Sequence, residues 1–220
     1  MVKTILITGA NRGIGAELAR QAAARGDKVT GTARDPAGVD FPGGQLLQAD
    51  VTDPATLRHL DQGGPLDLLI CNAGQYLARG GIDDPAHTAE AWQNVLMTNV
   101  AGVFFTIRAV LPRLRRTPGA KVAVISSIMG SSARAPGGSA IYRASKAAAT
   151  NLACNLAAEL GGDGIAVGAY HPGWVQTDMG GDQAPVTLQD SAAGLLARFD
   201  ALELGTTGVF EDYQGTSVAF

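Results

Sequence analysis

The stretch that decides the fold is Thr8-Gly9-Ala10-Asn11-Arg12-Gly13-Ile14-Gly15, which ends the apolar run 4–8 and opens a helix-length pattern over residues 14–25. Glycines at such a strand-to-helix turn let backbone N–H groups approach a phosphate at the positive end of the helix. Taken alone, the segment also fits a tight connection without a ligand. A triphosphate-binding loop is excluded, because Ala16 follows Gly15 where that motif has a lysine.

Outward from this turn, strand-length apolar runs alternate with helix-length patterns along the whole chain. The expected strands span residues 4–8, 28–33, 46–49, 66–71, 121–126, 165–170 and 208–210. The expected helices span residues 14–25, 54–62, about 88–116, 141–160 and 188–202. This alternation predicts a Rossmann-type α/β fold, a doubly wound parallel sheet of about seven strands with helices on both faces. No linker or repeat interrupts it, so one domain over residues 1–220 is expected.

The amino-acid composition limits the kinds of partner that the chain can bind. A chain of 220 residues with 46% hydrophobic residues can bury a core without disulfides, which excludes disorder. Seventeen Lys and Arg against twenty Asp and Glu leave no basic face for a nucleic acid or an anionic membrane. Cys71 and Cys154 do not make a disulfide framework, and no apolar run of signal-peptide or membrane-span length is evident. A cytoplasmic location is therefore expected.

A second feature lies in the helical pattern 141–160. Tyr142 and Lys146 are four residues apart, so they share one helix face. An ammonium near a phenol favours the phenolate and lowers its pKa from about 10, which makes tyrosine a usable proton donor and acceptor. The alternative is a structural stripe with Tyr142 at its amphipathic end. Lys146 argues against that alternative, because an ammonium in an apolar seam needs water or a partner, and a cofactor ribose would provide one.

Further motifs follow the expected strands in order. They are Asp50-Val51, Asn72-Ala73-Gly74, Asn99, Ser126-Ser127, Tyr142-Arg143-Ala144-Ser145-Lys146 and His171-Pro172-Gly173. With the T-G-x-x-x-G-x-G turn, they resemble the short-chain dehydrogenase/reductase family over nearly the whole chain. The segment from His171 and the tail 208–215 are most similar to the C-factor and sniffer-type carbonyl reductases. Cys71 stands where the family has another asparagine, a change expected to weaken cofactor affinity.

The resemblance implies roles for particular residues. Tyr142 would protonate the alkoxide, and Lys146 would activate Tyr142 and hold the ribose. Ser127 would hold the carbonyl oxygen, and Asn99 would support a proton relay; a turn-capping serine and a buried structural asparagine are the alternatives. His171 is expected to be structural. The implied cofactor-binding residues are Gly9, Asn11, Arg12, Gly13, Ile14, Gly15, Arg34, Asp50, Val51, Asn72, Ala73, Gly74, Tyr142, Lys146, Pro172, Gly173, Val175 and Thr177.

The end of the second expected strand indicates which dinucleotide is bound, because it meets the adenosine ribose. No carboxylate occupies its last positions, and Arg34 follows directly. Arg12 and Arg34 could converge on a 2′-phosphate, which favours NADP(H). Asp35 comes too late for ribose binding and is expected to begin the turn at Pro36.

The chain is therefore predicted to be an NADPH-dependent reductase of aldehydes or ketones with an open substrate mouth. A dinucleotide-binding signalling or sensor protein of the C-factor type and NAD-dependent alcohol oxidation remain alternatives. No metal site is expected, because His59, His87 and His171 lack metal-ligand spacing. The expected partners are a small carbonyl or alcohol substrate and further copies of the chain in a homodimer or a tetramer.

Overall fold

The computed structural model describes residues 2–220. Its centre is one parallel sheet of seven strands in the order β3-β2-β1-β4-β5-β6-β7. The strands are β1 Thr4–Thr8, β2 Lys28–Ala33, β3 Gly44–Gln48, β4 Leu68–Cys71, β5 Lys121–Ile125, β6 Ala166–His171 and β7 Phe210–Asp212. Each strand begins and ends within two residues of its expected bounds. The predicted Rossmann-type fold is confirmed.

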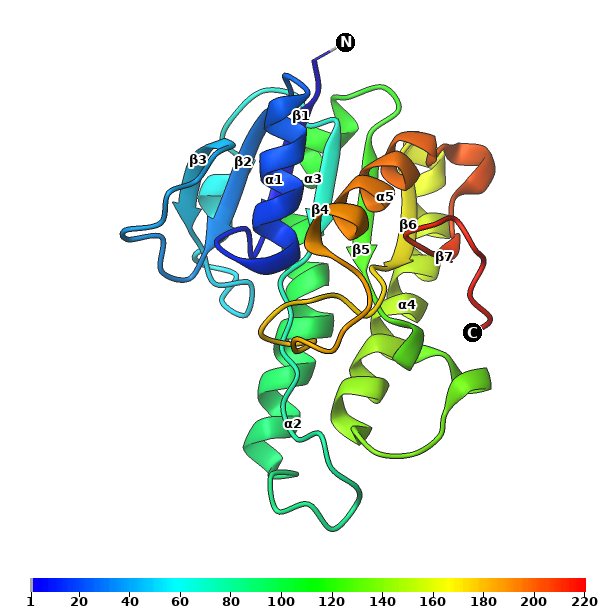
Figure 1. Ribbon diagram of the computed structural model, residues 1–220. Coiled ribbons are helices and arrows are strands. Elements are labelled where there is room, and N and C mark those ends of the chain that lie inside the picture. The colour runs from blue at the N-terminus through cyan, green and yellow to red at the C-terminus, as the bar shows by residue number, and fades with distance from the viewer. Residues whose placement is uncertain (1) are drawn as a thin grey trace.

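Helices cover both faces of the sheet. They are α1 Gly13–Ala24, α2 Ala89–Leu96, α3 Gly102–Arg115, α4 Ala140–Leu160 and α5 Leu188–Ala201. In Figure 1, α1 and α5 lie over one face, and α3 and α4 lie over the other. Alternate residues of a strand accordingly enter different cores: Ile5 packs with the α1 and α5 side chains, whereas Leu6 packs with those of α3 and α4. Burial on both faces explains why β1, β4, β5 and β6 are almost continuously apolar, whereas the edge strand β3 is partly exposed and contains two glutamines.

The expected helix over residues 54–62 is wrong in extent. Only a short 3₁₀ helix, η1 Arg58–Asp61, forms there. Side chains take the local hydrogen bonds instead: Asp53 Oδ1 accepts from the Ala55 N–H, and Thr56 Oγ1 donates to the Asp50 carbonyl. Such side-chain bonds to nearby backbone groups compete with helix formation.

The expected helix over residues 88–116 consists of α2, a π-helical turn η2 Met97–Ala101, and α3. The continuous segment Ala89–Arg115 is long and apolar enough to cross a membrane by length and composition, so the expectation that no run reaches that length was wrong. Val103, Val110 and Leu114 of this segment are buried in the cluster that contains side chains of β4 and β5. That packing is typical of a core helix.

Because all seven strands are parallel, their carboxyl ends share one edge of the sheet. The chain winds outward in opposite directions from β1, through β2 on one side and β4 on the other. Ligands of open α/β sheets bind in the crevice at such a switch point. The loops after β4, β5 and β6 gather below this edge in Figure 1.

Candidate active site

A cleft of about 860 Å³ opens at the carboxyl ends of the central strands. Most residues predicted to bind a cofactor form its wall. They are Gly9, Asn11, Arg12, Gly13, Ile14, Arg34, Asp50, Val51, Asn72, Ala73, Gly74, Tyr142, Lys146, Pro172 and Thr177. Gly15, Gly173 and Val175 are not part of that wall, and neither are Ser127 and Asn99. The structure thus brings together loops that are far apart in the sequence.

The glycine-rich turn shows two separate reasons for glycine. Gly9 and Gly13 have φ of +64° and +56°, a backbone conformation that L side chains rarely adopt. Gly15 instead lies where a Cβ would overlap the Gly9 carbonyl and sit 2.5 Å from Asn72 Nδ2. Gly15 therefore serves the packing of α1 against the turn, while the residues before it shape the cleft.

The turn and the loop after β4 form one continuous wall. Thr8 Oγ1 accepts from the backbone N–H groups of Asn72 and Ala73, at 3.0 and 3.1 Å. Asn72 Nδ2 donates to the carbonyls of Thr8 and Gly9, both at 3.0 Å. Cys71 is buried in the apolar core and lies outside the cleft wall, so its thiol replaces no cleft-facing group. Burial raises the pKa of Cys71 to about 12.

The end of β2 presents polar groups to the cleft. Thr32 Oγ1 is buried and has no hydrogen-bond partner among residues 2–220. Exposed Arg34 follows it on the same wall. Asp35 Oδ1 accepts from the Ala37 N–H at 3.0 Å, as expected for a turn residue. A free hydroxyl, a guanidinium and the amino end of α1 fit the phosphates and ribose of a dinucleotide.

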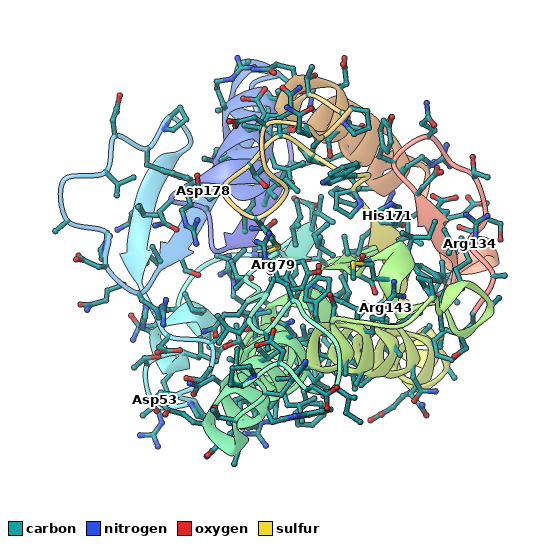
Figure 2. The ribbon with its side chains drawn as sticks, turned by 60° about the horizontal axis from the view of Figure 1, so that its bottom comes forward. Asp53, Arg79, Arg134, Arg143, His171 and Asp178 are labelled. Carbon is teal, nitrogen blue, oxygen red and sulfur yellow. The ribbon has the colours of Figure 1, made fainter. Side chains whose placement is uncertain are left out.

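The expected convergence of Arg12 with Arg34 is not seen, because the Arg12 side chain has another partner. Its guanidinium pairs with Asp178 of the loop after β6 at 2.6 Å, and both side chains are exposed. Figure 2, which looks onto the lower side of Figure 1, shows Asp178 beside the end of α1. The pair joins the glycine-rich turn to the loop after β6.

Tyr142 and Lys146 lie on α4, at the other end of the cleft. Lys146 is 4% exposed, and its Nζ donates to the Ile125 carbonyl at 2.8 Å. Burial lowers the pKa of Lys146 to about 8. The same Nζ lies 5.6 Å from the centre of the Tyr142 ring. An ammonium has three N–H donors, so Lys146 keeps donors for a ligand.

The pKa of Tyr142 differs from the sequence expectation. Burial raises it to about 12, a hydrogen bond with Ser127 opposes this rise, and the neighbouring Tyr76 adds to it. The predicted lowering by Lys146 is wrong for this structure, because loss of hydration outweighs an ammonium that is bonded elsewhere. The phenol is protonated at neutral pH, as an ordinary tyrosine with a pKa of about 10 also is, and a proton donor requires that state.

Two adjacent serines, Ser126 and Ser127, have different hydrogen-bond partners. Ser126 Oγ shares a 2.6 Å hydrogen bond with Thr150 Oγ1 and donates to the Lys146 carbonyl, so it ties β5 to α4. Ser127 contacts the Tyr142 phenol and also accepts from the Met129 N–H, which caps a short 3₁₀ helix, η3 Ile128–Gly130. The Ser127 side chain therefore caps a short helix and also contacts the phenol of Tyr142.

Asn99 bridges two elements with its side chain. Oδ1 accepts from the Gln75 N–H at 2.8 Å, and Nδ2 donates to the Gln75 carbonyl and to Ser145 Oγ, both at 2.9 Å. The amide therefore joins the loop after β4 to α4. Gly74 lies beside it, and a Cβ there would be 3.4 Å from Asn99 Oδ1 and 3.7 Å from Lys146 Nζ.

Two residues at this end, Tyr76 and Arg79, were missed by the sequence analysis. The ring of Tyr76 stacks on the ring of Tyr142, with centroids 4.2 Å apart and planes inclined by 25°. Arg79 Cζ lies 4.6 Å from the centre of the Tyr76 ring, and Arg79 also donates to the Met179 carbonyl. Figure 2 shows Arg79 near the middle of the view, with Arg143 and His171 to one side. The only sequence signal for Tyr76 and Arg79 is that they lie in the segment after the Asn72-Ala73-Gly74 motif.

The fold and the cleft define a class of protein. A glycine-rich turn at the switch point of a parallel sheet, with a buried phenol and ammonium on the same cleft wall, is typical of an α/β oxidoreductase that uses a dinucleotide. Among residues 2–220, no three His, Cys, Asp or Glu side chains are grouped to hold a metal ion.

The chain belongs to the short-chain dehydrogenase family, whose profile, described as short chain dehydrogenase, matches residues 3–186. It is 34% identical over 214 residues to the 3-oxoacyl-[acyl-carrier-protein] reductase FabG of Escherichia coli (strain K12), covering 92% of this chain and 84% of that protein. It is 40% identical over 161 residues to the C-signal protein of Myxococcus xanthus, covering 70% and 93%.

A solved structure of NADPH-bound carbonyl reductase from chicken fatty liver superposes with a TM-score of 0.90 at 30% identity, covering 100% of this chain and 99% of that one. The family membership predicted from the motifs is confirmed, and so is the resemblance to C-factor and carbonyl reductase proteins.

Proposed function

We propose that this oxidoreductase reduces the carbonyl group of aldehydes or ketones with NADPH. One observation carries the proposal: a buried ammonium, Lys146, and a buried phenol, Tyr142, lie one helical turn apart on the wall of the cleft that begins at the glycine-rich turn. A charge held in so dry a place requires a function or a partner.

NADPH, when bound, would supply the hydride for the carbonyl carbon. The turn from Gly9 to Ile14 would hold its phosphates, and Pro172 and Thr177 would orient its nicotinamide carboxamide. Ser127 Oγ holds the substrate oxygen as negative charge develops on it. Tyr142 donates its proton to that oxygen, and Lys146 holds the ribose and replenishes the proton. The amide of Asn99 is occupied, so any part in the relay falls to its backbone carbonyl.

Preference for NADPH is supported by the end of β2. Arg34 is exposed on the cleft wall, no carboxylate precedes it on the strand, and the Asp35 carboxylate is engaged in its own turn. The similar carbonyl reductase from chicken was solved with NADPH bound. Arg34 is therefore the principal contact for the 2′-phosphate, and Arg12 reaches it by leaving Asp178.

The proposal is tested by measuring NADPH consumption with a panel of aldehydes, ketones, quinones, diketones and 3-oxoacyl thioesters. The wild type is expected to turn over several of them. Tyr142→Phe is expected to lose turnover about 100- to 10,000-fold while NADPH still binds in a fluorescence titration. Equal turnover by this variant and the wild type would exclude Tyr142 as the proton donor.

The similarity to C-signal favours a second candidate, a dinucleotide-binding signalling or sensor protein. A wild type that binds NADPH but consumes none with the whole panel would support that function. Oxidation of an alcohol with NAD is the third candidate, and it requires that NADH bind more tightly than NADPH. Parallel titrations of the two reduced cofactors distinguish these cases.

We also propose a homodimer that uses α2 and α3. Trp92, Leu96 and Phe104 are apolar, and each exposes more than a third of its surface on these helices. Burial of such a face in a second copy is common among symmetric oligomers. A sizing column with light scattering distinguishes a monomer, a dimer and a tetramer.

A further inference from the structure

Tyr76 makes the closest aromatic contact to the proton donor of the proposed mechanism. Its ring stacks on Tyr142 with a centroid separation of 4.2 Å, within the range of favourable aromatic pairs. Tyr76 belongs to the loop after β4 and is not part of the dinucleotide cleft wall, whereas its neighbour Gln75 is. The stack therefore supports Tyr142 from outside the cofactor cleft.

Two sets of hydrogen bonds fix the position of Tyr76. The backbone N–H and carbonyl of Gln75 both bond to the Asn99 amide, at 2.8 and 2.9 Å, which anchors the loop directly before Tyr76. The Tyr76 hydroxyl shares a 2.7 Å hydrogen bond with Ser139 Oγ. Ser139 immediately precedes α4, the helix that carries Tyr142.

The same loop is joined to the start of α4 by backbone groups. The Ser139 N–H donates to the Gly80 carbonyl at 2.9 Å, and Ser139 Oγ donates to the Arg79 carbonyl at 3.0 Å. Ser139 has φ +52°, an unfavourable backbone conformation for a residue with a side chain. Non-glycine residues persist in such a conformation where surrounding contacts impose it. Here those contacts come from the loop that holds Tyr76.

We propose that Tyr76 is a positioning residue for Tyr142: its ring holds the plane of the phenol and excludes water from that face. The inference rests on the proposed reductase function, since it concerns the proton donor of that reaction. Exclusion of water agrees with the direction of the Tyr142 pKa, which burial raises. Arg79 extends the support, because its guanidinium contacts the Tyr76 ring and donates to Met179 in the loop after β6.

The test compares three substitutions at one position. Tyr76→Phe keeps the stacked ring and removes the hydroxyl, Tyr76→Leu keeps apolar volume without a ring, and Tyr76→Ala removes both. Leu77→Ala is the matched control, because Leu77 is the next residue of the loop and is exposed. Thermal unfolding and NADPH titration of each variant verify that it folds and keeps its cofactor cleft.

The ring is expected to matter and the hydroxyl to matter little. Tyr76→Phe and Leu77→Ala should keep kcat within about threefold of the wild type, whereas Tyr76→Ala should lose about 10- to 100-fold in kcat, the size of effect that misplacement of a reacting group produces. The Kd for NADPH should stay within about twofold in all variants, because Tyr76 lies outside the cofactor cleft.

A pH profile distinguishes positioning from general loss of structure. Removal of the ring lets water reach the Tyr142 phenol, so its pKa should fall from about 12 toward the ordinary value of about 10. Reduction needs the protonated phenol, so the alkaline limb of kcat should move to lower pH in Tyr76→Ala and Tyr76→Leu. It should not move in Tyr76→Phe.

Three results would overturn the inference: a wild-type kcat and pH profile in Tyr76→Ala and Tyr76→Leu, an equal loss in Tyr76→Phe, or a gain in kcat when the ring is removed. If Tyr76→Ala does not fold, the comparison of Leu with Phe decides. If the wild type reduces no carbonyl, the proposed function fails separately. Ultraviolet titration of phenolate, with Tyr142→Phe to assign the signal, then still shows whether the Tyr142 pKa falls in Tyr76→Leu.

Discussion

The two ends of the cleft are built in different ways. At the end proposed to bind the nucleotide, called the nucleotide end, backbone groups of a glycine-rich turn meet exposed charges such as Arg12 and Asp178, which are 68% and 82% exposed. At the end proposed to be catalytic, called the catalytic end, Tyr142 is 8% and Lys146 is 4% exposed. Exposed ion pairs contribute little to stability, whereas a buried charge with one neutral partner opposes it. Function and stability are therefore expected to conflict only at the catalytic end.

The largest expected effect comes from Lys146→Met, which replaces the buried ammonium with an apolar side chain of similar length. We expect turnover to fall by about 100-fold or more, because the proposed ribose contact and the proposed proton supply to Tyr142 are lost. Stability near neutral pH should rise. A pKa lowered from 10.5 to about 8 corresponds to a cost of roughly 3 kcal/mol for keeping the charge in the folded state.

The same variant has a pH signature. The unfolded chain binds the Lys146 proton more tightly than the folded one, so wild-type stability should increase as pH rises from about 8 to about 10.5. Lys146→Met should remove that increase, whereas Lys28→Met, at an exposed lysine of β2, should keep it. Urea unfolding at several pH values measures both. A Lys146→Met protein less stable than the wild type would show that the ammonium stabilises the fold.

The next effect in size concerns the shape of the nucleotide end. In Gly15→Ala, the new Cβ would meet the Gly9 carbonyl and Asn72 Nδ2, so α1 must shift away from the turn. We expect a loss of about 1–3 kcal/mol in the free energy of unfolding together with weaker NADPH binding. Gly162→Ala is the control, because nothing lies within 4 Å of its added Cβ. Equal behaviour of the two variants in urea unfolding would contradict the packing argument.

A smaller effect is expected for the arginine at the end of β2. Arg34→Ala should weaken NADPH binding about 10-fold or more, the value of a charged hydrogen bond, and leave NADH binding unchanged. Arg12→Ala should have a smaller effect, because Arg12 is engaged by Asp178. Fluorescence titrations with both reduced cofactors measure the difference. An equal loss of affinity for NADPH and NADH would show that Arg34 does not recognise the 2′-phosphate.

The smallest effect should come from Asp178→Asn. It breaks the ion pair with Arg12, yet both partners are exposed, so the free energy of unfolding should change by less than about 1 kcal/mol. NADPH should bind equally well or better, because Arg12 is released. Urea unfolding and NADPH titration at low and high salt check both points. Destabilisation by several kcal/mol would show that charged side chains affect the free energy of unfolding strongly at both ends of the cleft, which would contradict the comparison.

The sequence predicted the sheet well because four of its strands, β1, β4, β5 and β6, are buried on both faces and therefore form apolar runs in the sequence. Periodicity was insufficient at residues 54–62, where the side chains of Asp53 and Thr56 bond to the backbone in place of a helix. It was also insufficient at η2, because a π-helical turn adds one residue without interrupting the apolar pattern.

The candidate active site was also predicted only in part. The motif residues of the glycine-rich turn and of α4 could be placed from their spacing. The contacts of Tyr76 and Arg79 could not, because they depend on how a loop folds back on α4. The pKa of Tyr142 was mispredicted in direction because spacing gives the nearness of Lys146, whereas burial can be known only from the folded structure.

The measurement that tests the central claim most directly follows the hydride itself. The protein is incubated with NADPH that carries deuterium in place of both hydrogens on C4 of the nicotinamide, and with each aldehyde, ketone, diketone and 3-oxoacyl thioester of the panel. The alcohol is analysed by mass spectrometry. We predict that the wild type forms an alcohol with one deuterium on the former carbonyl carbon, and that Tyr142→Phe forms almost none although it binds NADPH. An unlabelled alcohol, or no alcohol from any compound while NADPH is bound, would contradict the proposed reductase.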